Sequence, residues 1–261
     1  MSAATDPVLL ALEGGVATLA FNRPQALNAL DIPTAAAFLA ACRSLASLDA
    51  VRAVVVRGEG RAFGAGGDLT ALRTDPAATA AQLIENMHQG IRLLAAMNAP
   101  VIASVHGTVA GGSLSLMLAC DLAIAADGTR FNLAYANVAA SCDVSGSWSL
   151  PRVVGLRRAM QIALLSESFD AAQALQFGLV NSVVPADRLA GETAALAGRL
   201  ASGPTLAYGR MKRLLRQSFE HGFEAQLDAE RDAFVASTGT QDFGEALAAF
   251  SGKRPPRFQG R

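Results

Sequence analysis

The chain is poor in charged and aromatic residues. Lys, Arg, Asp and Glu together make up 17% of its 261 residues, and Phe, Trp and Tyr make up 6%. Basic and acidic side chains number 22 each, so no whole-chain attraction to nucleic acid or to an acidic membrane surface is expected. Hydrophobic residues reach 51%, which excludes a disordered chain and is enough for a large core. We therefore expect a globular protein that binds no nucleic acid.

Cysteines and long apolar runs are also scarce. The three cysteines, Cys42, Cys120 and Cys142, lie far apart, so they predict neither a disulfide framework nor a metal site. No run of eighteen apolar residues is present, which argues against a membrane span. The first residues lack a basic region followed by an apolar segment, so we expect a cytoplasmic location. A phosphate-binding loop and a dinucleotide fingerprint are absent, so no permanently bound cofactor is expected.

Apolar runs alternate with helical patterns over the first two thirds of the chain. Residues 16–21, 53–57, 101–105, 122–125 and 180–184 are typical of strands, and most of the segments between them have helical periodicity. This alternation predicts mostly parallel strands joined by right-handed crossovers. After residue 185 the pattern is helical throughout. We therefore expect an α/β core over residues 1–185 and an α-helical region over residues 186–261.

Two glycine-bearing segments follow two of these strands. Residues 61–69 are Arg-Ala-Phe-Gly-Ala-Gly-Gly-Asp-Leu, and residues 106–114 are His-Gly-Thr-Val-Ala-Gly-Gly-Ser-Leu. Both can offer unblocked backbone N–H groups beside a ligand, and two such donors on one carbonyl oxygen would stabilise an enolate or a tetrahedral oxyanion. The alternative is that the glycines only satisfy turn geometry, since such turns are common in α/β proteins.

The two glycine segments belong to a longer series of motifs. The others are residues 21–24 with 27–30, 99–107, 118–126, 148–155 and 174–180. In this order they resemble the crotonase superfamily, also called the enoyl-CoA hydratase/isomerase family, from about Val8 to the C-terminus. The resemblance implies a crotonase (ClpP/crotonase-like) spiral of ββα repeats with a C-terminal helical region. It also implies a homotrimer or dimer of trimers, and an acyl-CoA thioester substrate that brings coenzyme A with it.

The same resemblance assigns the reacting groups. Gly67 and Gly112 would supply the two oxyanion-stabilising N–H groups. The two positions that hold catalytic glutamates in hydratases of the family are Ser115 and Tyr135 here, and neither can act as a carboxylate acid or base. Asp143 is the remaining carboxylate. It resembles the aspartate of a branch that includes phenylacetate-pathway-type isomerases and 4-chlorobenzoyl-CoA dehalogenase.

Asp143 leaves several reactions open. As a base it would shift a double bond, whereas as a nucleophile it would serve an acyl-CoA hydrolase or dehalogenase, with His88 as a possible base. A non-catalytic acyl-CoA-binding member is a third possibility. Asp143 could also simply cap a helix that begins near Val144. Tyr135 and Trp148 are expected to be walls of the acyl pocket.

Other polar residues have less specific patterns. The resemblance places Arg61 and Ala65 near coenzyme A, and Lys253 near the ligand of a neighbouring subunit. Asp68 is expected to support its loop, and Asp121 to cap or form a turn. The basic run at residues 210–216 has helical spacing, which favours a solvated helix face.

Overall fold

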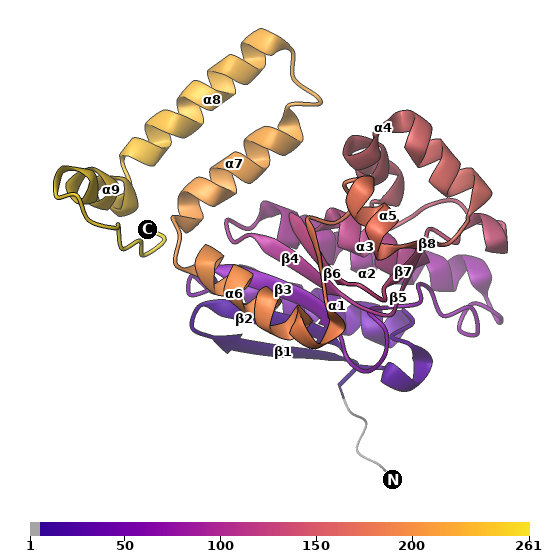
Figure 1. The fold of residues 1–261 in the computed structure, drawn as a ribbon. Coiled ribbons are helices and arrows are strands. Elements are labelled where there is room, and N and C mark those ends of the chain that lie inside the picture. The colour runs from indigo at the N-terminus through magenta and orange to yellow at the C-terminus, as the bar shows by residue number, and fades with distance from the viewer. Residues whose placement is uncertain (1–5) are drawn as a thin grey trace.

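A six-stranded sheet forms the larger layer of the fold. The computed structural model describes residues 6–261. The strands stand in the order β1-β2-β3-β4-β6-β9, and every neighbouring pair is parallel except β1 and β2. They are β1 (Val8–Glu13), β2 (Val16–Phe21), β3 (Ala53–Gly58), β4 (Val101–Val105), β6 (Leu122–Ala126) and β9 (Ser182–Val184). Figure 1 shows this sheet with helices on both faces.

A second, three-stranded sheet has the order β5-β7-β8. Its strands are β5 (Thr108–Ala110), β7 (Arg130–Asn132) and β8 (Phe169–Asp170). Successive chain segments give one strand to each sheet and then a helix: β4 and β5 lead into α3 (Gly111–Ala119), and β6 and β7 lead towards α4 (Gly146–Leu165). The predicted spiral of ββα repeats is therefore confirmed.

The helices of the core begin where the sequence offers a cap. Asp31 accepts a hydrogen bond from the Thr34 N–H at 2.9 Å and starts α1 (Ile32–Ala46). Asp75 does the same for α2 (Pro76–Ala96). Asp170 and Gln173 form a capping box at the start of α5 (Ala171–Gln176). Three short 3-10 turns complete the local structure: η1 (Pro24–Ala26), η2 (Ala136–Val138) and η3 (Ala186–Arg188).

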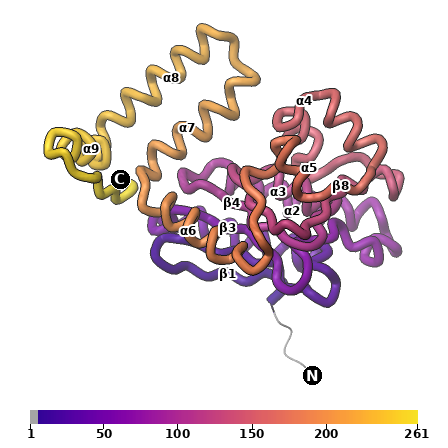
Figure 2. Tube along the Cα trace, in the orientation of Figure 1, coloured from indigo at the N-terminus to yellow at the C-terminus, as the bar shows by residue number. Residues whose placement is uncertain are grey.

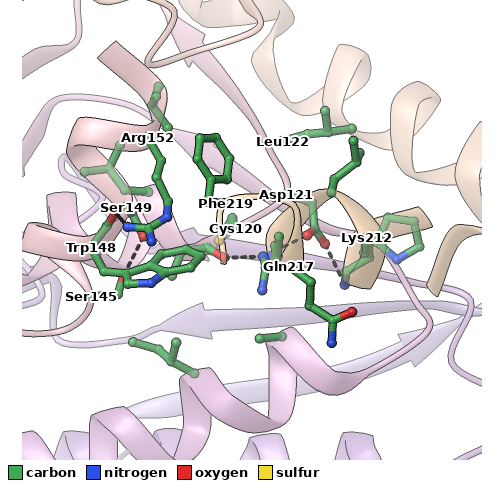
Figure 3. Close-up of a pocket in the computed structure, with 18 of the residues that line it drawn as sticks. Cys120, Asp121, Leu122, Ser145, Trp148, Ser149, Arg152, Lys212, Gln217 and Phe219 are labelled. Carbon is green, nitrogen blue, oxygen red and sulfur yellow. Dashed lines mark hydrogen bonds and ion pairs between the residues drawn. The ribbon is translucent and has the colours of Figure 1, made fainter. Parts of the chain in front are cut away.

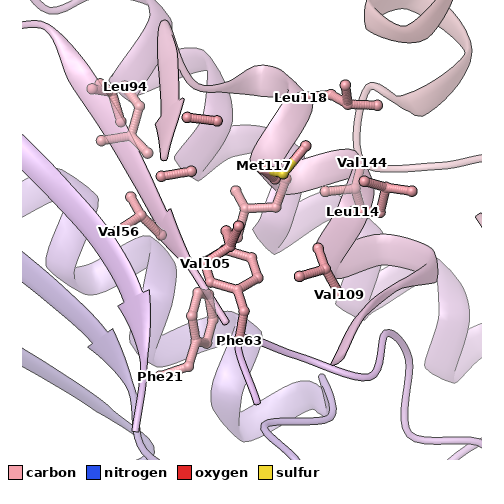
Figure 4. Packing of buried hydrophobic residues seen from close by; sticks show 14 of the residues in the cluster. Phe21, Val56, Phe63, Leu94, Val105, Val109, Leu114, Met117, Leu118 and Val144 are labelled. Atoms are coloured by element: carbon pink, nitrogen blue, oxygen red, sulfur yellow. The ribbon is translucent and has the colours of Figure 1, made fainter. Parts of the chain in front are cut away.

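The main core lies between the larger sheet and helices α1 to α3. Figure 4 shows side chains from several of these elements converging, with Phe63 and Val105 in the middle and Met117 above them. Val144 also belongs to this cluster and is fully buried. The residue that follows Asp143 is therefore anchored in the core, which fixes the backbone of the candidate site.

Short strands and one long helix differ from the sequence pattern. The periodicity predicts β2, β3, β4, β6 and β9 but not β1, β5, β7 or β8. Strands β5, β7 and β8 have only two or three residues and so carry little pattern, and β1 is an edge strand of six residues, most of them exposed. Helix α4 lies in one of the segments with helical periodicity, between residues 125 and 180. Its first half is separated by Gly155, whose φ of +75° interrupts the helical backbone.

The last three helices project from the core. Helix α6 (Leu189–Ala201) still packs on the larger sheet, where Leu189 and Ala197 meet Val55 and Ile102. Helices α7 (Thr205–Gln217), α8 (Phe223–Thr238) and α9 (Gln241–Ser251) extend away from it, as Figures 1 and 2 show. We call these three helices the helical arm. The division into a core over residues 1–185 and a helical region over residues 186–261 stays a prediction.

The basic run on α7 attaches this arm to the core. Lys212 is 9% exposed and lies 2.7 Å from Asp121, and Arg216 lies 2.9 Å from the same carboxylate. Lys212 also donates to the Ala99 carbonyl oxygen at 2.8 Å. The expectation of a solvated face is therefore wrong for these residues, since carbonyl groups at element ends and the Asp121 carboxylate supply acceptors. Burial lowers the pKa of Lys212, and Asp121 opposes that change. Asp121 also accepts from the Val101 N–H at 2.8 Å.

Gly107 provides a test of how closely the two glycine segments must pack. Its φ is +60°, and a Cβ at this position would collide with the Arg61 carbonyl oxygen. We expect Gly107→Ala to lower the free energy of unfolding by ~2–4 kcal/mol, because both the backbone conformation and the contact are lost. The measurement is urea unfolding. Gly128→Ala is the matched control, since nothing lies within 4 Å of its Cβ position. Equal losses in the two variants would contradict the close packing.

Candidate active site

The two glycine segments lie side by side. Gly64 forms an isolated parallel bridge with Val109 of β5. The Gly64 N–H donates to the Thr108 carbonyl at 3.0 Å, and the Ala110 N–H donates to the Gly64 carbonyl at 2.9 Å. This pairing extends the smaller sheet by one short stretch. It brings the end of the first segment to the start of α3, which the second segment forms.

Gly66 lies close to the start of the second segment's helix. Its φ is +94°, and a Cβ built there would lie 3.1 Å from the Ala110 carbonyl oxygen and 3.4 Å from the Gly112 nitrogen. The Gly66 N–H donates to the Ser113 Oγ at 3.2 Å. On the other side, Leu30 bridges to Gly67. The backbone of residues 66 and 67 is therefore held from two directions, and a side chain at residue 66 would force the segments apart.

Gly67 and Gly112 keep their N–H groups free. Within the part of the chain that the structure describes, neither group donates a hydrogen bond to the protein. Gly112 is the second residue of α3, where N–H groups have no partner within the helix and the helix dipole favours negative charge. Gly67 is exposed, whereas Gly112 is buried. Two unpaired amides thus lie on neighbouring backbone segments.

Asp143 stands beside Gly112. A Cβ built on Gly112 would lie 3.6 Å from the Asp143 Oδ1. The Tyr135 hydroxyl donates a short hydrogen bond to the same Oδ1 and lies 2.9 Å from the Ser115 Oγ. The structure therefore brings together Gly112, Ser115, Tyr135 and Asp143, four of the residues that the sequence singles out.

The surroundings of the Asp143 carboxyl change its acidity. Burial raises its pKa above the ordinary value, while the hydrogen bond from Tyr135 and the nearby His88 imidazole oppose that rise. Burial and the neighbouring Asp143 charge raise the pKa of Tyr135, so its phenol stays protonated. A neutral donor thus faces a carboxylate that is partly withdrawn from water.

The turn after Asp143 is strained and is stabilised by His88. Val144 has a φ of +51° and Ser145 a φ of +72°, a left-handed conformation that is rare for a β-branched residue. The Val144 N–H donates to the His88 Nε2 at 3.2 Å. Because a backbone N–H can only donate, this nitrogen must be unprotonated here. His88, on α2, therefore helps to hold the turn.

Asp143 does not cap α4. The N-cap residue of this helix is Ser145, and no side chain accepts a capping hydrogen bond there. The interpretation of Asp143 as a helix cap is therefore wrong. Its carboxylate is directed to Tyr135 instead, because the left-handed turn at residues 144 and 145 carries the chain round before α4 begins.

Trp148 lies in a groove next to this cluster. The groove has a volume of about 720 Å³ and runs between α4 and α7. In Figure 3 the Arg152 guanidinium stacks on the Trp148 ring, at 4.0 Å from its centroid, with Phe219 nearby. Neither Asp143 nor the two glycines line this groove. The structure therefore places Trp148 one helical turn beyond Asp143, with no recorded contact to it.

The three residues expected near coenzyme A lie apart from one another. Arg61 is exposed, and its carbonyl packs against Gly107. The Ala65 N–H donates to the Leu27 carbonyl at 3.0 Å. Lys253 follows α9 at the far end of the helical arm and is exposed. Figure 1 shows α9 well away from α3 in this chain.

Two supporting residues were not singled out from the sequence. Asn28 is 1% exposed and donates to the carbonyl oxygens of Glu59 and Ala62 at 2.9 Å and 2.8 Å, so it holds the approach to the first glycine segment. Ser113 accepts from Gly66. Both residues lie inside motifs on which the family resemblance rests, and these motifs are the signal that could have identified them. Asp68 supports its loop as predicted, since it accepts from Arg23 at 3.3 Å and from the Thr70 N–H at 3.1 Å.

The described residues show no metal cluster and no membrane helix. Across residues 6–261, no group of three His, Cys, Asp or Glu side chains could hold a metal ion. In the same range, no helix combines the length and the apolar character needed to cross a membrane.

Comparison with known proteins identifies the family. The sequence profile of the family described as enoyl-CoA hydratase/isomerase matches residues 11–261. The chain is 35% identical over 258 residues to 1,2-epoxyphenylacetyl-CoA isomerase of Escherichia coli, covering 97% of this chain and 98% of that protein. It is 34% identical over 243 residues to 4-chlorobenzoyl coenzyme A dehalogenase-2 of an Arthrobacter species, covering 92% of this chain and 88% of that protein.

A solved structure agrees with these relatives. An enoyl-CoA hydratase from a Polaromonas species matches with a TM-score of 0.91 at 34% identity, covering 97% of this chain and 99% of that one. The three relatives are named for three different reactions, so similarity does not select one of them. Family membership is common to all of them. The chain belongs to the enoyl-CoA hydratase/isomerase family.

Proposed function

We propose that this protein is an enoyl-CoA isomerase in which Asp143 moves one proton along the acyl chain. The observation that carries the proposal is the position of the Asp143 carboxylate, beside Gly112 and hydrogen-bonded to Tyr135. Within residues 6–261, it is the only carboxylate hydrogen-bonded to Ser115 or Tyr135. A double-bond shift needs only one such group, because the carboxylate that takes a proton from one carbon becomes the acid that returns a proton to another.

The reaction proceeds through an enolate. Asp143 removes a proton from the carbon between the double bond and the thioester carbonyl, and the electron pair moves onto the carbonyl oxygen. The N–H groups of Gly67 and Gly112 donate to that oxygen, and the dipole of α3 adds favourable potential. The double bond re-forms next to the carbonyl as Asp143 returns the proton to the far carbon. No water and no second acid take part.

Hydration by two glutamates is disfavoured at this site. The corresponding residues are Ser115 and Tyr135, whose hydroxyl groups hydrogen-bond to each other at 2.9 Å. Neither hydroxyl can activate water as a carboxylate base does near neutral pH, and the pKa of Tyr135 is raised further by burial. The relatives named as hydratases therefore do not decide the reaction of this chain.

The principal alternative uses Asp143 as a nucleophile. It is favoured by the similarity to 4-chlorobenzoyl coenzyme A dehalogenase-2 and requires a base for the later hydrolysis. His88 is the nearest imidazole, but its Nε2 accepts the Val144 N–H. Using that nitrogen as a base would release the strained turn that holds Asp143. Binding of acyl-CoA without turnover is a further alternative.

Coenzyme A would lie along the first glycine segment. We assign Arg61 to the phosphate and adenine end because its side chain is exposed at the start of this segment, and Ala65 to the wall beside the thioester. Lys253 would act on the ligand of a neighbouring subunit, since it follows the last helix of the projecting arm. These contacts are supported by position alone.

The helical arm supports assembly into a trimer or a dimer of trimers. Helix α8 has no buried residue, although an isolated chain normally buries one face of such a helix. Its large apolar residues include Phe223, at 75% exposure, and Phe234, at 65%, and α9 adds Phe250, at 86%. An apolar surface of this kind is typical of one that another subunit covers.

The first test replaces the proposed base. We expect Asp143→Asn to lower the rate of double-bond movement by ~100- to 10,000-fold, the range for loss of a general base. The assay follows deuterium uptake from D2O into trans-3-hexenoyl-CoA and ring-type acyl-CoAs by mass spectrometry. Asp127→Asn is the matched control, because Asp127 is exposed on a turn.

The products of the same assay separate the alternatives. Release of free coenzyme A or halide without exchange would replace isomerisation by hydrolysis or displacement. Exchange that survives in Asp143→Asn would remove Asp143 from the chemistry. Tight binding without any turnover, in wild type as well, would favour the non-catalytic alternative.

The second test concerns assembly. Light scattering of the eluted protein should give about three or six times the subunit mass of 26.9 kDa. We expect the Phe223→Glu, Phe250→Glu double variant to elute as a monomer, because charge replaces apolar surface at the contact. Leu48→Glu is the control, since Leu48 is also exposed but lies outside the arm. A monomeric wild type would refute the proposed assembly.

A further inference from the structure

Three side chains from separate parts of the chain form one hydrogen-bonded row. Ser115 comes from α3, Tyr135 stands just before η2, and Asp143 stands just before α4. The Ser115 Oγ lies 2.9 Å from the Tyr135 hydroxyl, which donates to the Asp143 Oδ1. Ser115 is fully buried, and Gly146 packs directly against its hydroxyl. The row therefore leads from the core to the carboxylate.

The row has a fixed direction. Tyr135 has a single hydroxyl proton, and its strongest acceptor is the Asp143 carboxylate. Once that proton is used, the Tyr135 oxygen can only accept, so Ser115 must donate to it. Both hydroxyl protons then point towards Asp143. A carboxyl group that receives this hydrogen bond is favoured in its ionised form, because a carboxylate oxygen accepts more strongly than the oxygen of the neutral acid.

The row also distinguishes the two oxygens of Asp143. Oδ1 accepts from Tyr135, whereas Oδ2 has no hydrogen-bond partner in the protein among residues 6–261. An oxygen with all its lone pairs free is the better proton acceptor. We propose that Tyr135, oriented by Ser115, is a positioning residue that keeps Asp143 ionised and leaves Oδ2 as the oxygen that takes the substrate proton. This inference rests on the proposed isomerase function.

The same hydrogen bond serves both halves of the proton shift. When Oδ2 takes the proton, the Tyr135 hydrogen bond still favours the ionised form of the carboxyl. Protonated Asp143 is then a stronger acid than it would be in an apolar pocket without the phenol. It therefore returns the proton readily to the far carbon, and the carboxylate is restored with no net change in the protein.

Other groups near Asp143 must be separated from Tyr135 in any pH experiment. His88 faces it from α2, and Cys142 precedes it in the chain. Ser115 faces Tyr135 from α3, and the Val144 N–H is already donated to His88. His88→Gln keeps an acceptor for the Val144 N–H and removes the imidazole that faces Asp143.

The experiment measures kcat/KM for deuterium exchange into trans-3-hexenoyl-CoA between pH 4 and 9. Activity should fall in acid as Asp143 becomes protonated. In Tyr135→Phe, loss of the hydrogen bond should raise the pKa of Asp143, so this fall should move upward by about one to two pH units. Above the shifted range the rate of the variant should no longer change with pH relative to that of wild type. Ser115→Ala should give a smaller shift in the same direction.

A second measurement does not use Tyr135→Phe, and its spectroscopic part needs no substrate. The chain has two tyrosines, Tyr135 and Tyr208, so 3-fluorotyrosine can be placed at both, with Tyr208→Phe identifying the Tyr135 signal. Its fluorine resonance should titrate with Asp143, and this titration should vanish in Asp143→Asn. Because fluorophenol is the stronger donor, the acid fall in activity should move to lower pH.

These readouts separate failure of the two proposals. If Asp143→Asn exchanges deuterium as fast as wild type, the isomerase proposal fails whatever Tyr135 does. Asp143 could prove essential while kcat/KM falls at the same pH in wild type, Tyr135→Phe and Ser115→Ala. That result would overturn the positioning role. A loss of rate that is equal at every pH would mean that Tyr135 acts only through packing. If Tyr135→Phe still shifts the pH at which activity falls when His88→Gln is also present, the shift is due to Tyr135 and not to His88.

Discussion

The site depends on one backbone pairing, the bridge between Gly64 and Val109. Residues 61–69 and 106–114 leave different strands of the larger sheet, and this bridge joins them, next to the hydrogen bond from the Phe63 N–H to the His106 carbonyl at 2.9 Å. Two hydrogen bonds, from Gly64 to Thr108 and from Ala110 to Gly64, place them side by side. Gly66 can then approach the start of α3 because it has no side chain. Two free amides and a carboxylate therefore share one region.

A second constraint acts on the ionisation of the Asp143 carboxyl. Taking the Asp143 carboxyl out of water favours its neutral form, whereas the Tyr135 hydroxyl favours the ionised form. Placing Asp143 here also requires the left-handed turn at Val144 and Ser145. That turn is stabilised by the burial of the Val144 side chain in the core and by His88. The conformational strain is thus offset by contacts that belong to the fold itself.

Much of this arrangement could be predicted from the sequence. Apolar runs predicted five strands of the larger sheet, because periodicity is a local property of the sequence. The resemblance to a family selected Gly112, Ser115, Tyr135 and Asp143, which the fold brings together. The hydrogen bond between Tyr135 and Asp143 could not be predicted, since it depends on a left-handed turn at a valine. The buried state of Lys212 was missed for a similar reason: its partner Asp121 lies 91 residues earlier in the chain.

The attachment of α7 through Lys212 and Arg216 has a consequence for how the protein can change over time. The ion pairs between this helix and the core meet at Asp121, and hydrogen bonds from Lys212 and Arg216 reach nearby carbonyl groups. Helix α8 touches none of them. The outer half of the arm can therefore accumulate substitutions without disturbing the packing around the two glycine segments. Core and arm are free to diverge at different rates, and lineages that share one chemistry can differ in how their subunits meet.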